Sequence, residues 1–201
     1  MIEEPLNLSH FRCRCIYSRR PGLPIVFLHG YNYTSYVWRD IGLLQRLEEE
    51  RIPYLAIDMP YGARSMCSPK TRDPEENIEI LATAIKGLYR GTAPLLVGAS
   101  LGGYIALRYA VRKPVSGLLL IAPVKALEEE LVSHYEDMAV PTMIIWGSRD
   151  RIVSREEMEK LAKILDARLI VYEGARHAAY LDHPERFADD LLAFYKALHL
   201  R

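Results

Sequence analysis

Short apolar runs alternate with longer amphipathic stretches along this 201-residue chain, and that alternation restricts the fold more than any other feature. The runs are almost continuously hydrophobic and are bounded by Gly, Pro or Asp, which is typical of buried parallel strands. They are Ile25–Leu28, Tyr54–Ile57, Leu95–Val97, Leu118–Ile121, Met143–Trp146 and Leu169–Tyr172. The stretches between them have helical patterns near residues 37–51, 74–90, 101–112, 154–165 and 184–198.

Strands and helices that alternate in this way indicate βαβ units, and therefore an α/β fold. We expect a mostly parallel, twisted sheet of about six or seven strands with helices on both faces. A further strand near Phe11–Tyr17 is expected at one edge. No repeat or polar linker interrupts the pattern, and the length suits one unit, so we expect a single domain over residues 1–201.

Charge and hydropathy exclude several classes of partner. The chain has 26 basic and 26 acidic side chains, so it has no basic field for nucleic acid or an anionic membrane. Its longest aliphatic stretch, Leu118–Ala122, is far shorter than the roughly 20 residues of a spanning helix. The first residues lack the cationic start and apolar run of a signal peptide. We therefore expect a cytoplasmic protein without nucleic-acid or membrane partners.

The sequence indicates neither a disulfide framework nor a cofactor site. Cys13 and Cys15 are spaced for neither an unstrained disulfide nor a four-ligand zinc site, and with one more cysteine the total is odd. We expect these cysteines to be ordinary strand or core residues. The first strand–helix turn lacks both glycine-rich nucleotide motifs, and no metal motif is present. We expect no cofactor and no metal.

Ligands of open parallel sheets bind beyond the carboxyl ends of the strands. The residues that follow the predicted strands include a serine, an aspartate late in the chain and a histidine late in the chain: Ser100, Asp150 and His177. Ser100 lies in Gly98-Ala99-Ser100-Leu101-Gly102, between a strand and a helix, where a sharp turn exposes its hydroxyl and the glycines allow close packing. The alternative interpretation is a helix N-cap with flexible glycines.

A serine hydroxyl needs a base to accept its proton. His177 follows the last predicted strand and can reach the same sheet edge, and Asp150 can hold the imidazole in the required tautomer. The alternatives are a loop histidine without a role as base, and an aspartate that pairs with Arg151 or begins a helix. An oxyanion would need two N–H donors, for which we expect the amides of Leu101 and Tyr31. His29 is expected to brace that turn by hydrogen bonding.

These motifs resemble the α/β-hydrolase superfamily over essentially the whole chain. The matching segments are Leu28-His29-Gly30, Asp58-Met59-Pro60, Gly98 to Gly103, Trp146 to Asp150 and Gly174 to His177. The resemblance implies that Ser100 is a nucleophile, His177 a base and Asp150 its orienting acid, with Tyr31 and Leu101 as the oxyanion donors. Asp58 is interpreted as structural. The chain departs from the family where Tyr61 and Ala63 replace two glycines, and Tyr61 is expected near the site.

The family's helical cap is expected to be minimal or absent. Only Val124 to Val140 separate the two strands between which many relatives insert a lid, and this leaves room for one short helix containing a solvated acidic run, Glu128-Glu129-Glu130. We therefore expect small or exposed acyl groups. The aromatic side chains expected to line a shallow pocket are Tyr31, Tyr33, Tyr36, Trp38 and Tyr61, with helix packing as the alternative for the first four.

The sequence predicts a serine hydrolase, a carboxylesterase that cleaves small carboxylic esters through an acyl-enzyme, with a small-molecule ester or acyl compound as its partner. An acyltransferase, or an amide or thioester deacylase, would use the same three residues. A binding protein that has kept the fold without catalysis is the alternative from another class. Three complementary catalytic groups count against it, because a binding protein has no physical need for them.

Overall fold

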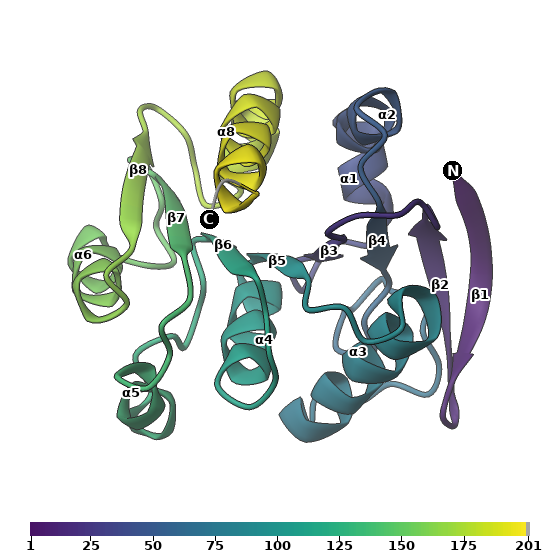
Figure 1. The fold of residues 1–201 in the computed structure, drawn as a ribbon. Coiled ribbons are helices and arrows are strands. Elements are labelled where there is room, and N and C mark those ends of the chain that lie inside the picture. The colour runs from purple at the N-terminus through teal and green to yellow at the C-terminus, as the bar shows by residue number, and fades with distance from the viewer. Residues whose placement is uncertain (200–201) are drawn as a thin grey trace.

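The computed structural model describes residues 1–199 and contains one eight-stranded sheet with helices on both faces (Figure 1). The strand order is β1-β2-β4-β3-β5-β6-β7-β8. The last six strands of that order run parallel, whereas β1 and β2 form an antiparallel hairpin that pairs with β4. The strands are β1 (Ile2–Leu8), β2 (Phe11–Tyr17), β3 (Ile25–Leu28), β4 (Tyr54–Ile57), β5 (Leu95–Ala99), β6 (Gly117–Ile121), β7 (Thr142–Gly147) and β8 (Arg168–Tyr172).

The predicted fold class is confirmed, but the strand count of six or seven is wrong. The sheet has eight strands because the N-terminal residues form β1, which we did not predict. Most of β1 is exposed, and it contains Pro5, which is tolerated at a sheet edge. An exposed edge strand lacks the continuous apolar run that identifies buried strands, so its sequence does not distinguish it from a loop.

The helices follow the predicted pattern with one break. The helices are α1 (Tyr36–Asp40), α2 (Leu43–Glu49), α3 (Pro74–Tyr89), α4 (Leu101–Ala110), α5 (Glu129–Tyr135), α6 (Arg155–Ile164), α7 (Ala179–Asp182) and α8 (Pro184–Leu198). The helix expected over 37–51 is divided into α1 and α2 at Gly42, whose φ of 78° lies in the left-handed region. Within residues 1–199, no helix has both the length and the apolar character to cross a bilayer.

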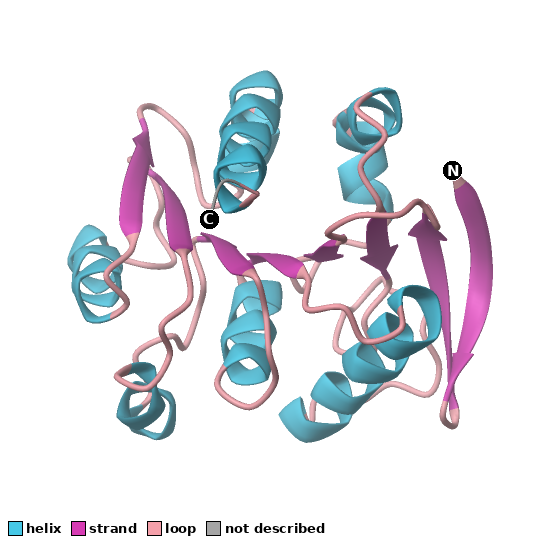
Figure 2. Ribbon diagram, viewed as in Figure 1, coloured by secondary structure: helices cyan, strands magenta, loops and turns pink. Residues whose placement is uncertain are grey.

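Two apolar layers hold the sheet between its helices (Figure 2). Helices α3, α4, α5 and α6 contribute to the layer on one face, and α1, α2, α7 and α8 to the layer on the other. The central strands β3 to β7 are buried throughout, as expected for parallel strands covered on both sides. This packing fixes the carboxyl ends of the strands, where the predicted site residues lie.

The segment in place of a cap is the seven-residue helix α5, which is tied to the body of the protein. The Arg108 side chain of α4 is only 8% exposed and pairs with Glu130 of α5 at 2.8 Å and with Glu75 of α3 at 3.1 Å. Glu130 stays exposed, in agreement with the interpretation of the acidic run as a solvated face, and its ion pair with Arg108 is an additional contact. Its partner lies 22 positions earlier on another helix, so local spacing does not show it.

The expectation that the cysteines are ordinary core residues is also wrong for two of them. Cys13 of β2 forms a disulfide with Cys67, which lies in the loop after β4. The partners are 54 residues apart and are brought together by the antiparallel pairing of Arg12 with Ser68. Cys15 is a free, buried thiol, and burial raises its pKa to about 12.

Candidate active site

Ser100 occupies the turn between β5 and α4 in a conformation that L-residues rarely adopt. Its φ is 52° and its ψ is −113°, and its N–H donates to the carbonyl of Ile121 at 2.8 Å. Close packing requires glycines around it. A methyl group on Gly98 would lie 2.5 Å from the Gly102 carbonyl oxygen, and one on Gly102 would overlap the Leu28 carbonyl. The strained turn thus directs the Ser100 side chain away from the strand.

The structure brings Ser100, His177 and Asp150 into one chain of hydrogen bonds. His177 Nε2 lies 2.9 Å from Ser100 Oγ, and His177 Nδ1 lies 2.7 Å from Asp150 Oδ2. The Asp150 side chain is fully buried, and its Oδ1 accepts the backbone N–H groups of Ile152 and Val153 at 2.7 and 3.3 Å. Both carboxylate oxygens are therefore occupied, which holds the imidazole in one orientation.

This arrangement has a defined chemical capacity. Asp150 can only accept, so the proton of a neutral His177 resides on Nδ1, and Nε2 is left to accept the hydroxyl proton of Ser100. The His177 side chain is 19% exposed, so the site opens to solvent at the imidazole. A serine polarised in this way can attack an electrophilic carbon.

The predicted oxyanion donors lie beside the serine. A methyl group on Gly30 would be 3.7 Å from Ser100 Cβ, so the turn that continues to Tyr31 borders the Ser100 side chain. Leu101 directly follows Ser100 at the start of α4. Within residues 1–199, neither the Tyr31 nor the Leu101 amide donates to another protein group, so both are free to bind an oxygen.

His29 braces this turn from behind. Its ring is fully buried, and Nε2 accepts the Met59 N–H at 3.0 Å. Because that ring nitrogen is an acceptor, Nδ1 carries the proton and donates it to the Gly30 carbonyl at 2.8 Å. Burial lowers the pKa of His29, since a charged ring would be poorly solvated there. The imidazole thus links the turns after β3 and β4 in its neutral form.

We expect His29 to make the protein less stable as the pH falls below about 6.5. Between that ordinary pKa and the lower pKa of the folded state, only the unfolded chain binds the proton, so the free energy of unfolding decreases with pH. Urea unfolding at pH 7 and pH 5 measures this decrease in the free energy of unfolding.

Variants of single histidines identify its source. His29→Gln cannot titrate at this position, so its free energy of unfolding should decrease less between pH 7 and pH 5 than that of wild type. His134→Gln, on the exposed face of α5, is the control. Equal slopes for wild type and His29→Gln would contradict the assignment.

Asp58 follows β4 and connects three segments of the chain by hydrogen bonds. Its buried carboxylate accepts the N–H groups of Ser35 and Met66, both at 2.6 Å, and pairs with Arg14 at 2.9 Å. All its contacts are made with backbone or with β2, and they fix the loops that support the site. This arrangement agrees with the structural interpretation of Asp58.

The five predicted pocket aromatics divide into two groups. Tyr31 and Tyr33 are exposed beside the Gly30 turn, and Tyr61 lines a cavity of about 320 Å³ with Tyr31 while its hydroxyl donates to the His29 carbonyl at 2.6 Å. Trp38 and Tyr36 pack against other side chains, as in the alternative of helix packing. Trp38 is fully buried against Phe27, Tyr180 and Phe187, and Tyr36 lies between the guanidinium groups of Arg14 and Arg39.

A larger cavity, of about 790 Å³, opens on the His177 side of the site and was not predicted. Its walls come from the loops after β7 and β8 and from the end of α7. The lining residues are Arg149, Arg151, Ile152, Glu173, Gly174, Arg176, His177, Asp182 and His183. The signal for it in the sequence is the density of arginines around Asp150 and His177.

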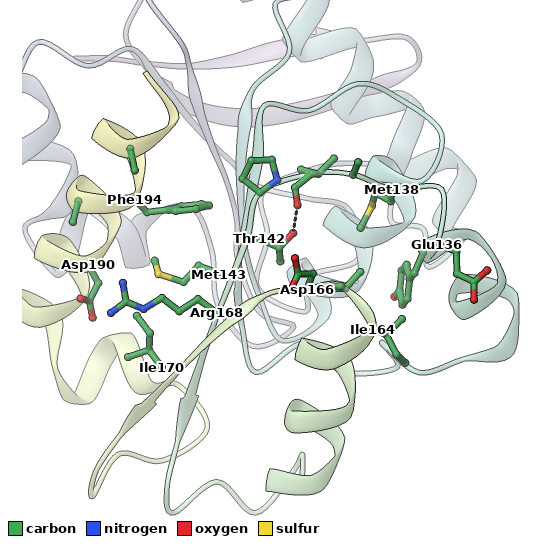
Figure 3. Close-up of a pocket in the computed structure, with 17 residues that line it drawn as sticks. Glu136, Met138, Thr142, Met143, Ile164, Asp166, Arg168, Ile170, Asp190 and Phe194 are labelled. Atoms are coloured by element: carbon green, nitrogen blue, oxygen red, sulfur yellow. Dashed lines mark hydrogen bonds between the residues drawn. The ribbon is translucent and has the colours of Figure 1, made fainter. Parts of the chain in front are cut away.

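A third cavity, of about 710 Å³, lies where β7 and β8 begin (Figure 3). Its wall includes Thr142 at the start of β7, Arg168 at the start of β8 and Phe194 of α8. None of the three hydrogen-bonded site residues reaches it, so it is separate from the candidate active site. Within residues 1–199, no three His, Cys, Asp or Glu side chains are grouped as around a metal ion.

The mostly parallel sheet and the serine turn between β5 and α4, with histidine and aspartate beyond later strands, define the α/β-hydrolase class of fold. Two family models match the chain. One, described as "Alpha/beta hydrolase family", covers residues 25–132, and the other, described as "alpha/beta hydrolase fold", covers residues 124–184. The chain therefore belongs to the α/β-hydrolase family.

The chain is also similar to individual proteins of known sequence or structure. The chain is 31% identical over 180 residues to protein ABHD14A of Danio rerio, a match that covers 89% of this chain and 66% of that protein, so it spans just under two thirds of that relative. It is 29% identical to "Putative protein-lysine deacylase ABHD14B" of Rattus norvegicus, over 87% of this chain and 83% of the relative. A predicted CIB-like hydrolase from Thermoplasma acidophilum shares the fold, with a TM-score of 0.87, 23% identity and 98% of each chain covered.

Proposed function

We propose that this protein is a serine hydrolase that cleaves small carboxylic esters through an acyl-enzyme. The observation that carries the proposal is the continuous hydrogen-bonded chain from Ser100 Oγ through His177 to the buried carboxylate of Asp150. The free amides of Tyr31 and Leu101 beside the serine support it, because acyl transfer develops a negative oxygen that needs such donors.

The reaction takes two steps. His177 Nε2 accepts the hydroxyl proton while Ser100 Oγ attacks the ester carbonyl carbon, and the Tyr31 and Leu101 amides bind the resulting oxyanion. The bond to the alcohol oxygen then breaks, and His177 gives its proton to that oxygen. Water transfers a proton to His177 while its oxygen attacks the acyl carbon, the bond from that carbon to Ser100 Oγ breaks, and His177 returns the proton to Oγ, which releases the carboxylic acid and restores both residues. Asp150 stabilises the imidazolium in both steps.

The open surroundings of the site favour small or exposed acyl groups. Helix α5 has seven residues and is held to α4 by Arg108, and so it makes no lid over Ser100 in the way a long helical insertion could. The adjoining aromatic wall is formed by the exposed Tyr31 and Tyr33.

The same residues could remove an acyl group from an amine. The names of the ABHD14B relatives favour this second candidate, and the open mouth suits an acyl group presented on a lysine of a larger partner. His177 would then protonate the departing amine. Transfer of the acyl group to an acceptor other than water would follow the same first step, and product analysis with competing nucleophiles separates the two outcomes.

The first test is labelling with a fluorophosphonate, which requires no knowledge of the natural substrate. We expect wild type to gain one covalent adduct by intact mass and the Ser100→Ala variant to gain none. Ser116→Ala, which removes a hydroxyl that donates to the Ala93 carbonyl away from the site, is the matched control and should be labelled like wild type. Folded wild type that acquires no adduct would refute the proposal, and an adduct that persists in Ser100→Ala would identify a different nucleophile.

A further inference from the structure

The cavity beside His177 has the right position to receive one particular part of a substrate. In the proposed reaction, His177 Nε2 returns its proton to the atom that leaves the acyl carbon, so the leaving group departs on the histidine side. His177 lines this cavity, whereas the oxyanion residues Tyr31 and Leu101 do not. The cavity therefore faces the alcohol or amine part of the substrate, or the acceptor that replaces it.

The charges in the cavity are not balanced. Arg176 is neutralised by Asp182, which accepts its guanidinium at 2.6 Å and its backbone N–H at 2.7 Å. Arg149 and Arg151 are exposed and form no ion pair with any residue from 1 to 199. Glu173 is the remaining carboxylate in the lining. Two arginines without an ion-pair partner among residues 1–199 thus line the leaving-group space, and the lining contains one opposing charge, that of Glu173.

An apolar surface accompanies these charges. Ile152 is 65% exposed in the same lining, and its N–H is bound to Asp150 Oδ1, so its position is coupled to the aspartate beside His177. An exposed isoleucine in the same lining as Arg149 and Arg151 offers contact to a hydrocarbon or aromatic body that ends in an anion. Arginine suits that anion, because its planar fork matches the geometry of carboxylate and phosphate oxygens.

We propose that this cavity binds a negatively charged leaving group or acyl acceptor, with Arg149 and Arg151 holding its carboxylate or phosphate and Ile152 contacting its apolar body. The inference rests on the proposed function, since it names the substrate class of the same site. It is carried by the unpaired arginines and by the position of His177 at the edge of the cavity. Ser100 and its acyl-enzyme chemistry are unchanged by it.

The test compares acetate esters of four phenols that differ only in the para group. The groups are a neutral amide, a carboxylate, a phosphate ester and a quaternary ammonium. For each ester, kcat/KM is measured in wild type and in the Arg149→Ala/Arg151→Ala double variant, and the ratio of the two cancels the intrinsic reactivity of the ester. An exposed charge pair contributes roughly two- to fivefold, so we expect the ratio for anionic esters to fall about tenfold relative to the neutral ester. The carboxylate and phosphate arms show which anion is preferred.

Two further variants keep the test decisive if the double variant folds poorly. Glu173→Gln removes the opposing charge, so it should raise the relative kcat/KM for anionic esters about twofold. Arg168→Ala removes an exposed arginine at the far end of β8 and should leave every ratio unchanged. Added salt should reduce wild-type kcat/KM for the anionic esters more than for the neutral one.

The inference and the proposed function fail in different ways. Wild type that is not labelled by fluorophosphonate refutes the hydrolase itself. The anionic site alone is overturned if wild type is labelled but neither the double variant nor Glu173→Gln changes the relative kcat/KM values of the four esters. A higher kcat/KM for the cationic ester than for the anionic ones in wild type would also overturn it.

Discussion

The Asp150→Asn variant is expected to retain its fold and lose about 10⁴-fold in kcat. Asparagine can still accept the Ile152 N–H through its amide oxygen, which replaces Oδ1. Its NH₂ group would then face His177 Nδ1 where Oδ2 now accepts. Two donors cannot pair, so His177 would move its proton from Nδ1 to Nε2. A protonated Nε2 in a neutral ring cannot accept the Ser100 proton, and the base is lost although every side chain remains in position.

The Asp150→Asn substitution should lower kcat without changing the free energy of unfolding. Steady-state hydrolysis of a phenyl acetate ester gives kcat, and urea unfolding shows whether the variant is folded. Asp137→Asn, an exposed position after α5, is the matched control and should turn over like wild type. A decrease in kcat of less than about tenfold in folded Asp150→Asn would show that this carboxylate does not set the tautomer of the base.

The Gly102→Ala variant is expected to lower the free energy of unfolding by about 3 kcal/mol or more, a large loss for a domain of this size. Its new methyl group would overlap the Leu28 carbonyl oxygen and lie 2.7 Å from Leu28 C and 2.8 Å from His29 O. These are backbone atoms of β3 and the turn after it, so no side chain can rotate away. Helix α4 must retreat from the sheet and carry Leu101 and Ser100 with it. Fluorophosphonate labelling should slow in parallel.

A second glycine supplies the control for this effect. Gly87 lies in α3, and a methyl group there would meet no atom within 4 Å. Gly87→Ala should therefore raise the free energy of unfolding by about 0.5–1 kcal/mol, because alanine favours the helix and loses less backbone entropy on folding. Urea midpoints of the two variants measure both effects. Equal stability of Gly102→Ala and wild type would refute the close approach of α4 to β3.

The central strands and the serine turn could be read from the sequence because local patterns encode them. The four residues Ile25–Leu28 form β3 with the predicted bounds, and a glycine on each side of Ser100 predicted the sharp turn that its φ of 52° shows. His177 and Asp150 could be chosen since parallel strands all end at one edge of the sheet. The fold class, which the alternation of strands and helices indicates, was therefore enough to predict that these residues meet.

Other residues have roles that depend on partners distant in the sequence. Trp38 follows the Gly30 turn closely enough to suggest a pocket, yet α1 turns it into the layer beneath α7 and α8, where Tyr180 and Phe187 cover it. Cys67 reaches Cys13 only because the loop after β4 pairs with β2. An aromatic or a thiol has the same local pattern in either environment, so the sequence does not distinguish them.

The sequence by itself determined the α/β class, the positions of the buried strands along the chain and the three residues that share the candidate active site, because hydrophobic periodicity and glycine positions act within a few residues. Only the tertiary structure decided that β1 closes the sheet edge, that Arg108 holds the α5 helix and that Arg149 and Arg151 face a cavity beside His177. Each of these depends on contacts between segments far apart in the chain. Such contacts follow from how loops and helices pack in space, and local periodicity carries no record of them.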